Sequence, residues 1–215
     1  MCGRFASYKN LNKLKNIFNI SNTDFNFLIS YNISPGQDVN IVLNHKDENY
    51  LLPSNWGYNF INSKTHNNQS VINSRIETIN SKLLFKDSFL KRKCIIPANG
   101  YFEWSQKEGE KKPYFVQLRD GELIYFAGVW RKEKHNDDKR RVFSIITKAA
   151  NKKINEIHHR MPVILNANNA QDYLESENNN IIFDNSEDMD LTFYEVSKYV
   201  NSPKNNDEKC ILAIN

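Results

Sequence analysis

The 215 residues of this chain are enough for a domain with a sizeable core, and aromatic residues make up 12% of them. The net charge of +4 permits an anionic partner without requiring one. No apolar run reaches the length of a membrane span, and the N-terminus does not resemble a signal peptide. We therefore expect a cytoplasmic protein, nucleoid-associated in a prokaryote or nuclear in a eukaryote.

The three cysteines, Cys2, Cys94 and Cys210, are odd in number and lie far apart in the sequence. No CxxC pair occurs, so the spacing predicts neither a disulfide framework nor a zinc site. We expect no metal and no cofactor.

The first half of the chain is predicted to form two helices with one strand between them. Apolar residues at helical spacing predict helices over residues 8–19 and 75–90, and a short apolar run predicts a strand over 39–43. The first helix rests on the spacing of Tyr8, Leu11, Leu14 and Phe18. The side chains of the second that are expected to face the core are Leu83, Leu84, Phe85, Phe89 and Leu90.

Strand-like segments dominate the second half of the chain. They cover residues 94–96, 101–104, 114–118, 123–130, 142–147, 163–165 and 191–197. Two further helices are predicted at 149–157 and 168–174. Runs of strands with irregularly inserted helices predict an α+β fold with a mostly antiparallel sheet or barrel, and no linker or repeat divides residues 1–215 into more than one domain.

Cys2 is the first residue with distinctive chemistry. Aminopeptidases remove Met1 before a small second residue, which would leave Cys2 with a free α-amine next to its thiol. The α-amine titrates at about 7.7–8.0, so roughly a quarter of it is neutral and nucleophilic at cytosolic pH. Such a 1,2-aminothiol condenses with aldehydes. The alternative is an inert cysteine at the second position.

Residues 73–78, Asn-Ser-Arg-Ile-Glu-Thr, place an amide, a guanidinium and a carboxylate close together. The Asn73 amide could donate to an oxyanion or a sugar hydroxyl, and Arg75 could form a fork with a phosphate. The alternative is a helix start, in which Ser74 caps the helix and Glu77 completes a capping box.

Glu103 lies in a predicted aromatic strand, where Tyr101 and Glu103 share one face. A carboxylate among aromatic rings would have a raised pKa and would suit acid–base catalysis. The alternative is a solvent-facing glutamate on an edge strand.

His158 and His159 follow the helix predicted at 149–157. Histidine can exchange protons near neutral pH. The alternatives are favourable contacts with the helix dipole and, less readily for two neighbours, metal ligation.

Taken in order, these segments resemble the SOS response-associated peptidase (SRAP) family, also called abasic-site processing proteins. The matching blocks are MCGRF at 1–5, YNISPG at 31–36, WG at 56–57, NSRIET at 73–78, CIIP at 94–97, GYFEW at 100–104, AGVW at 127–130, HHRMP at 158–162 and VSKYVN at 196–201.

The resemblance implies one α+β domain with a barrel-like β core, flanking helices and a basic groove for single-stranded DNA. It implies that Cys2 attacks the aldehyde of an abasic site and closes a thiazolidine, leaving a DNA–protein crosslink. Asn73 would position the terminal cysteine and the sugar. Glu103 and His158, rather than the neighbouring His159, would transfer protons.

The resemblance also implies a set of DNA-contacting residues. Arg4, Arg75 and Arg160 would contact phosphates, and Pro35 and Trp56 would line the nucleotide path. The implied partners are single-stranded DNA containing abasic sites and proteins of the replication fork, and we expect a monomer that does not bind membranes. Lyase activity and self-removal of Met1 belong to the same set of expectations.

The chain departs from the family pattern after Trp56 and Gly57. Relatives usually continue with a hydrophobic residue, a proline and a tryptophan, whereas this chain has Tyr58, Asn59 and Phe60. The rival interpretations are a cysteine hydrolase with an N-terminal nucleophile, either a glutamine amidotransferase or a peptidase, and a non-covalent binder of single strands.

Overall fold

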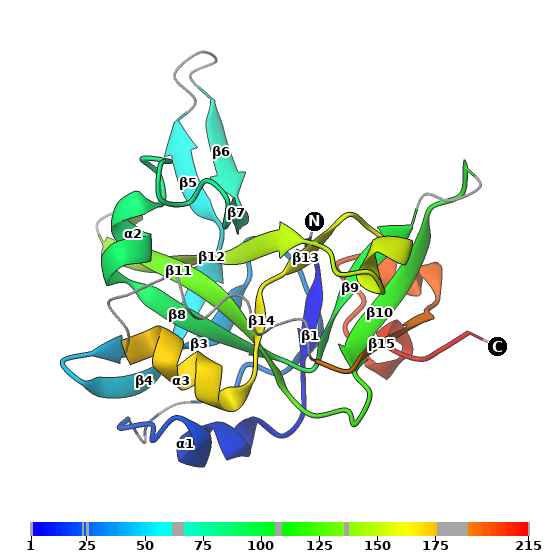
Figure 1. Cartoon of the computed structure of the whole chain (residues 1–215), viewed down its shortest axis with the longest axis horizontal. Coiled ribbons are helices and arrows are strands. Elements are labelled where there is room, and N and C mark those ends of the chain that lie inside the picture. The colour runs from blue at the N-terminus through cyan, green and yellow to red at the C-terminus, as the bar shows by residue number, and fades with distance from the viewer. Residues whose placement is uncertain are drawn as a thin grey trace.

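Five long strands close into a barrel in a computed structural model of the protein (Figure 1). The ring runs β12–β4–β3–β8–β11 and returns to β12, which pairs with both β11 and β4. The β12–β4 pairing is parallel and the others in the ring are antiparallel. The strands are β3 (Asp38–His45), β4 (Glu48–Trp56), β8 (Lys93–Ala98), β11 (Ile124–His135) and β12 (Asp138–Ala149). The predicted α+β fold with a barrel-like core is confirmed.

The structure describes residues 2–22, 24, 26–61, 67–105, 109–135, 138–175 and 189–214. Among these residues, no helix is long and apolar enough to span a membrane.

Three short strands extend the barrel sheet around β12 and β11. The strand β7 (Asn73–Arg75) runs parallel to β12, and β13 (Arg160–Pro162) pairs antiparallel with the end of β12. The strand β14 (Ile164–Leu165) pairs with β11. The end of β12 therefore brings residues 73–75 beside the barrel near residues 160–162.

A second, antiparallel sheet packs beside the barrel in the order β15–β10–β9–β1–β2. Its strands are β1 (Phe5–Ser7), β2 (Ser30–Ile33), β9 (Gly100–Ser105), β10 (Lys112–Leu118) and β15 (Leu191–Glu195). Phe5 and Tyr101 from this sheet join Trp56, Phe126 and Phe143 of the barrel in one buried cluster. The short helices η5 (Lys198–Asn201) and η6 (Glu208–Cys210) follow the sheet.

The helices cover a different part of the barrel. They are α1 (Leu14–Ile17), α2 (Lys86–Lys91) and α3 (Ala167–Glu175), with η1 (Leu11–Lys13) directly before α1. Their buried residues Leu14, Phe89 and Tyr173 pack against Val42 and Ile95 of the barrel. The helix predicted at 168–174 is confirmed, and the strands predicted from 39–43 through 191–197 correspond to observed strands.

The helix predicted at 8–19 is wrong at both ends, because only residues 11–17 are helical. Asn10 and Asn19 flank this segment with φ angles of 61° and 44°, and this left-handed backbone conformation does not continue a right-handed helix. Tyr8 instead stacks on Tyr31, with 4.6 Å between the ring centroids.

Most of the helix predicted at 75–90 is also wrong. Residues 73–75 form β7, and the Ile76 amide donates to the carbonyl of Thr147, so pairing with β12 overrides the local helical pattern. Turns follow, and only α2 is helical. Phe85 and Phe89 are buried as expected, whereas Leu83 is 94% exposed and Leu84 and Leu90 are only partly covered. The capping-box alternative fails with the helix.

The helix predicted at 149–157 shrinks to a single turn, η3 (Ile154–Glu156). Ala149 is the last residue of β12, where it pairs with Arg160. The first residue of the predicted helix is therefore in a strand instead.

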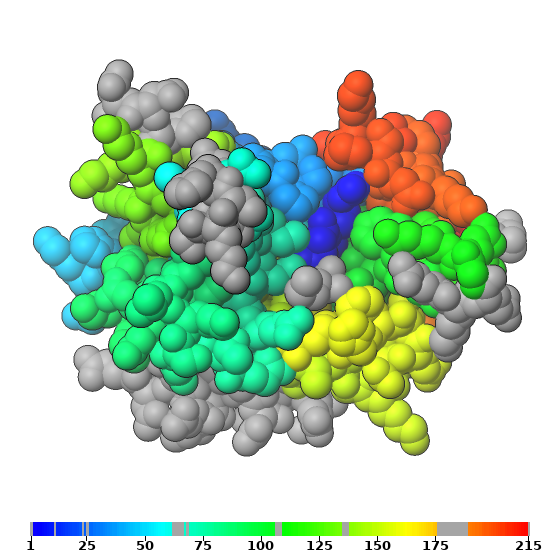
Figure 2. All heavy atoms as spheres, turned by 90° about the horizontal axis from the view of Figure 1, so that it is seen from above, coloured from blue at the N-terminus to red at the C-terminus, as the bar shows by residue number. Residues whose placement is uncertain are grey.

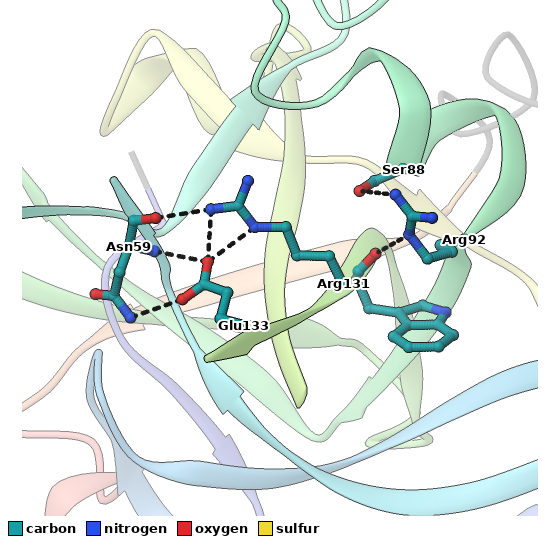
Figure 3. Close-up of polar contacts among 6 residues, drawn as sticks. Asn59, Ser88, Arg92, Arg131 and Glu133 are labelled. Carbon is teal, nitrogen blue, oxygen red and sulfur yellow. Dashed lines mark hydrogen bonds and ion pairs between the residues drawn. The ribbon is translucent and has the colours of Figure 1, made fainter. Parts of the chain in front are cut away.

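The atypical residues after Gly57 form β5 (Tyr58–Ile61), which pairs with β6 (Asn68–Val71) in a projecting hairpin (Figure 1). Glu133 accepts hydrogen bonds from the backbone and side-chain nitrogens of Asn59, both at 3.0 Å (Figure 3). Arg131 donates to the Asn59 carbonyl and lies over the Tyr58 ring. The hairpin is thus tied to β11 by a charged network.

Candidate active site around Cys2

The N-terminal segment lies between several parts of the chain that are distant in sequence. Figure 2 shows its dark-blue residues between the teal surface that follows β7, the yellow surface that precedes β13 and the orange C-terminal segment. Cys2 is fully buried. Its backbone carbonyl accepts a hydrogen bond from Asn73 Nδ2 at 2.8 Å. Met1 lies outside the described residues.

Asn73 holds Cys2 from the edge of the barrel. It is opposite Ile145 in the parallel pairing of β7 with β12, so its position is fixed by a barrel strand. Its Oδ1 atom is buried and has no hydrogen-bond partner among the described residues. Since a buried polar atom without a partner is costly, this oxygen is suited to accept a hydrogen bond from a bound group.

Glu103 lies in β9 and is 2% exposed. Burial raises its pKa to about 6, and the nearby His159 acts in the opposite direction. Burial also raises the pKa of the Cys2 thiol, and the negative charge of Glu103 raises it further. The carboxyl group therefore lies close to the thiol, with a pKa that lets it both give and accept a proton near neutral pH.

His158 precedes β13 and is half-buried. Its Nδ1 atom lies 3.0 Å from the backbone nitrogen and 3.2 Å from the carbonyl oxygen of Arg160, so the backbone of Arg160 fixes the orientation of the ring. Its pKa is lowered, first by burial. His159 is exposed and stacks on His158 with 4.4 Å between the ring centroids. His158 is thus the oriented ring of the pair.

The site is a thiol, an amide, a carboxyl group with a pKa near neutrality and an oriented imidazole. No cluster of metal-ligating side chains occurs in the part of the chain that the structure describes. The family model described as SOS response associated peptidase (SRAP) matches residues 1–203.

The chain belongs to the SRAP family.

Relatives named abasic site processing proteins match between two thirds and nearly all of the chain. It is 32% identical to the abasic site processing protein YoqW of Bacillus subtilis over 98% of this chain and 99% of that protein. It is 29% identical to the abasic site processing protein HMCES of Gallus gallus over 66% of this chain and 50% of that protein.

Solved structures share the fold. A protein from Bacteroides thetaiotaomicron superposes with a TM-score of 0.80 at 21% identity, covering 99% of this chain and 100% of that one. A phage-related protein from Bordetella bronchiseptica gives a TM-score of 0.71 at 22% identity, covering 91% and 94%.

The structure corrects one DNA-contacting residue inferred from the SRAP resemblance. Trp56 is fully buried, its ring lies edge-on to Phe5, and its indole nitrogen donates to the Ile72 carbonyl. It therefore belongs to the core and does not line a nucleotide path. Pro35, in contrast, is exposed in the adjacent turn.

The three SRAP arginines have different environments. Arg75 is exposed. Arg4 is half-buried and donates to Asn32 Oδ1 at 2.7 Å and to the Val200 carbonyl at 2.8 Å. Arg160 is 8% exposed, and its guanidinium donates to Glu77 and to the Thr147 carbonyl. Arg75 is therefore the arginine whose side chain is most accessible to a phosphate.

Arg160 makes a two-point contact with Glu77, at 2.5 and 3.0 Å, and donates to the Thr147 carbonyl at 2.8 Å. We expect Arg160→Ala to lower the free energy of unfolding by about 2–3 kcal/mol, because it leaves Glu77 and a buried carbonyl without their donor. We expect Arg75→Ala to leave stability nearly unchanged but to weaken binding to undamaged single-stranded DNA, with a salt slope smaller by about 1. Denaturant titrations and binding isotherms at several salt concentrations test this pair. Equal stability loss in both variants would contradict it.

Sequence reasoning missed three residues of this site. The sequence predicts Glu77 as part of a polar segment or of a capping box and not as the partner of Arg160, and Thr147 carries no chemical signal in the sequence. Strand alternation predicts that Tyr101 shares the face of Glu103, but it predicts no role for Tyr101.

Proposed function

We propose that this protein processes abasic sites in single-stranded DNA by forming a covalent crosslink through Cys2 after Met1 has been removed. The observation that carries the proposal is the buried Cys2, held by Asn73 and placed beside Glu103, whose pKa is about 6. Membership of the SRAP family and relatives named abasic site processing proteins support the substrate. The proposed crosslink would protect the abasic site during the DNA damage response.

The proposed chemistry begins with the ring-opened sugar of an abasic site. The Cys2 amine adds to the C1′ aldehyde, and protonation and loss of the hydroxyl group as water give an iminium ion (a protonated imine). The thiol sulfur then adds to the iminium carbon, the π electrons become the nitrogen lone pair, and the thiol proton passes to a base, which gives the neutral thiazolidine. Glu103 supplies a proton for water loss and accepts one during ring closure, because its pKa lies near neutrality.

The imine stage also connects the site to lyase chemistry. Removal of a C2′ proton from the imine would expel the 3′ phosphate and break the strand. The proposal includes this lyase activity and self-removal of Met1. It also includes action at replication forks as a monomer, in the cytoplasm or the nucleus. Arg75 and Pro35 are exposed and can contact the DNA backbone. Backbone contacts are sufficient here, because the protein has no base to recognise at an abasic site.

Mixing the mature protein with a single-stranded oligonucleotide that contains one abasic site tests the proposal. A band that survives denaturation and heating without added reductant is the expected result. Binding without such a band would leave a non-covalent binder, and release of ammonia from glutamine would favour the amidotransferase interpretation.

The two histidines give a prediction within this function. We expect His158→Ala to slow crosslink formation or reversal by on the order of 10²-fold, because its ring is oriented by Arg160. His159→Ala should remain close to wild type, since its ring is exposed. Single-turnover rates on an abasic oligonucleotide measure both. A slow His159→Ala beside a normal His158→Ala would reverse the assignment.

A further inference from the structure

A buried hydroxyl group next to the site has no role in the chemistry described so far. Tyr101 is fully buried, and its Oη atom has no hydrogen-bond partner among the residues that the structure describes. A buried hydroxyl without a partner is costly to stability, whereas phenylalanine would fill nearly the same space without that cost. The hydroxyl is therefore a candidate for a functional group.

Strand pairing places this hydroxyl on the side of the active site. Tyr101 and Glu103 alternate onto one face of β9, and Tyr101 is paired with Phe5 of β1, three residues after Cys2. Cys2, Phe5 and Tyr101 belong to the same buried cluster. The Tyr101 ring is held edge-on against Phe126, with 6.0 Å between the centroids.

The electrostatic environment agrees with that placement. The pKa of Tyr101 is raised well above its ordinary value. The largest cause is burial, followed by electrostatic interactions with Glu103 and with Cys2. The hydroxyl therefore stays protonated and can donate one hydrogen bond while it accepts another. Glu103 and Cys2 are near enough to shift the pKa of the hydroxyl, but neither is hydrogen-bonded to it in this structure, so a relay requires both groups to close on the hydroxyl when the aldehyde binds.

The Cys2 thiol needs an internal route for its proton. Cys2 is fully buried and the pKa of its thiol is raised, so the reacting species is the thiol rather than a preformed thiolate. Ring closure must remove that proton as the sulfur–carbon bond forms. The sulfur is not exposed to solvent in this structure, and the nearby base is Glu103.

We propose that the Tyr101 hydroxyl relays the thiol proton from Cys2 to Glu103 when the thiazolidine closes, and returns it when the ring opens. The hydroxyl oxygen accepts the proton from sulfur while the hydroxyl hydrogen passes to the carboxylate of Glu103. The sulfur lone pair forms the bond to C1′, and the π electrons of the protonated imine become the nitrogen lone pair, so nitrogen ends neutral and the thiol proton ends on Glu103. This inference rests on the proposed crosslinking function.

Tyr101→Phe separates the two covalent steps. The imine, trapped with cyanoborohydride, should form at the wild-type rate, because the amine does not use the relay. Closure to the adduct that survives heating without reductant should slow by on the order of 10²-fold. Strand cleavage should rise, because the imine persists. Tyr173→Phe is the matched control, since it removes a buried hydroxyl whose partner, the Gly128 carbonyl, lies away from the site.

A double variant distinguishes a relay from a packing effect. If Tyr101 and Glu103 lie on one proton path, Tyr101→Phe combined with Glu103→Gln should close the ring no more slowly than Glu103→Gln alone. Independent, multiplying effects would overturn the relay. So would wild-type closure in Tyr101→Phe while Cys2→Ala forms no adduct. Absence of any adduct in the wild-type protein would instead overturn the proposed function.

Discussion

Replacement of Cys2 by alanine should abolish the adduct that survives heating without reductant. Alanine at position 2 still permits Met1 removal and keeps the α-amine, so an imine can form, but no sulfur is present to close the ring. The variant should therefore give a DNA adduct only after cyanoborohydride treatment. Denaturing gels with and without reductant measure this difference. A tag left in front of Cys2 should be more severe and remove both adducts, since it blocks the amine.

The other two cysteines are the controls. Cys94 and Cys210 are buried, in separate hydrophobic clusters, and Cys94 Sγ lies in the barrel next to Gly128. Buried thiols of this kind behave as small apolar groups. Cys210→Ala and Cys94→Ala should crosslink normally when folded. Loss of the adduct in a folded Cys94→Ala or Cys210→Ala protein would contradict the role given to Cys2.

Glu103→Gln should slow adduct formation by roughly 10²–10⁴-fold while leaving binding to undamaged single-stranded DNA nearly unchanged. Glutamine keeps the size of the side chain but can neither give a proton to the departing water nor accept one from the thiol. Single-turnover rates and binding isotherms measured on the same preparations test this. A parallel loss of DNA binding would show that the carboxylate is structural.

The same substitution should stabilise the fold at neutral pH. Glu103 has a pKa of about 6 in the folded protein, above its ordinary value of 4.5, so the folded state binds more protons between these values. The contribution of this group to stability therefore falls as pH rises through that interval, and the buried charge costs about 2 kcal/mol at pH 7. Denaturant titrations at pH 4.5 and pH 7 should show this decrease in the wild type and not in Glu103→Gln.

The strands were largely predictable from sequence because their apolar alternation is local. Residues 94–96 are a continuous apolar run, residues 142–147 are apolar apart from Ser144 and Thr147, and both segments form barrel strands. The helices predicted at 75–90 and 149–157 fail for a common reason. Residues 73–75 and 149 pair with strands that are distant in the sequence, so they are extended rather than helical. A local sequence pattern does not identify such a partner.

The site was predictable by motif and only partly by physics. Chemistry alone singled out Cys2, Glu103 and the histidine pair, but their proximity depends on how β1, β9 and β13 meet. Trp56 shows the limit of transferring positions by motif, since the ring packs inside the barrel in this chain. Arg160 shows a second limit, because only the structure reveals that Glu77 and Thr147 already occupy its donors.

The strand β12 also bears on how the chain reaches its native state. It pairs with β4, β7, β11 and β13, and its contact with β4 joins residues 55 and 142. Contacts between residues so distant in sequence require the closure of long loops, which slows folding toward the millisecond-to-second range. Docking of β12 closes the barrel. It also fixes the position of β7, from which Asn73 contacts Cys2, and of β13, the strand that follows His158. We therefore expect barrel closure and assembly of the candidate site to occur together, so that a nascent chain would gain the site only when the barrel is complete.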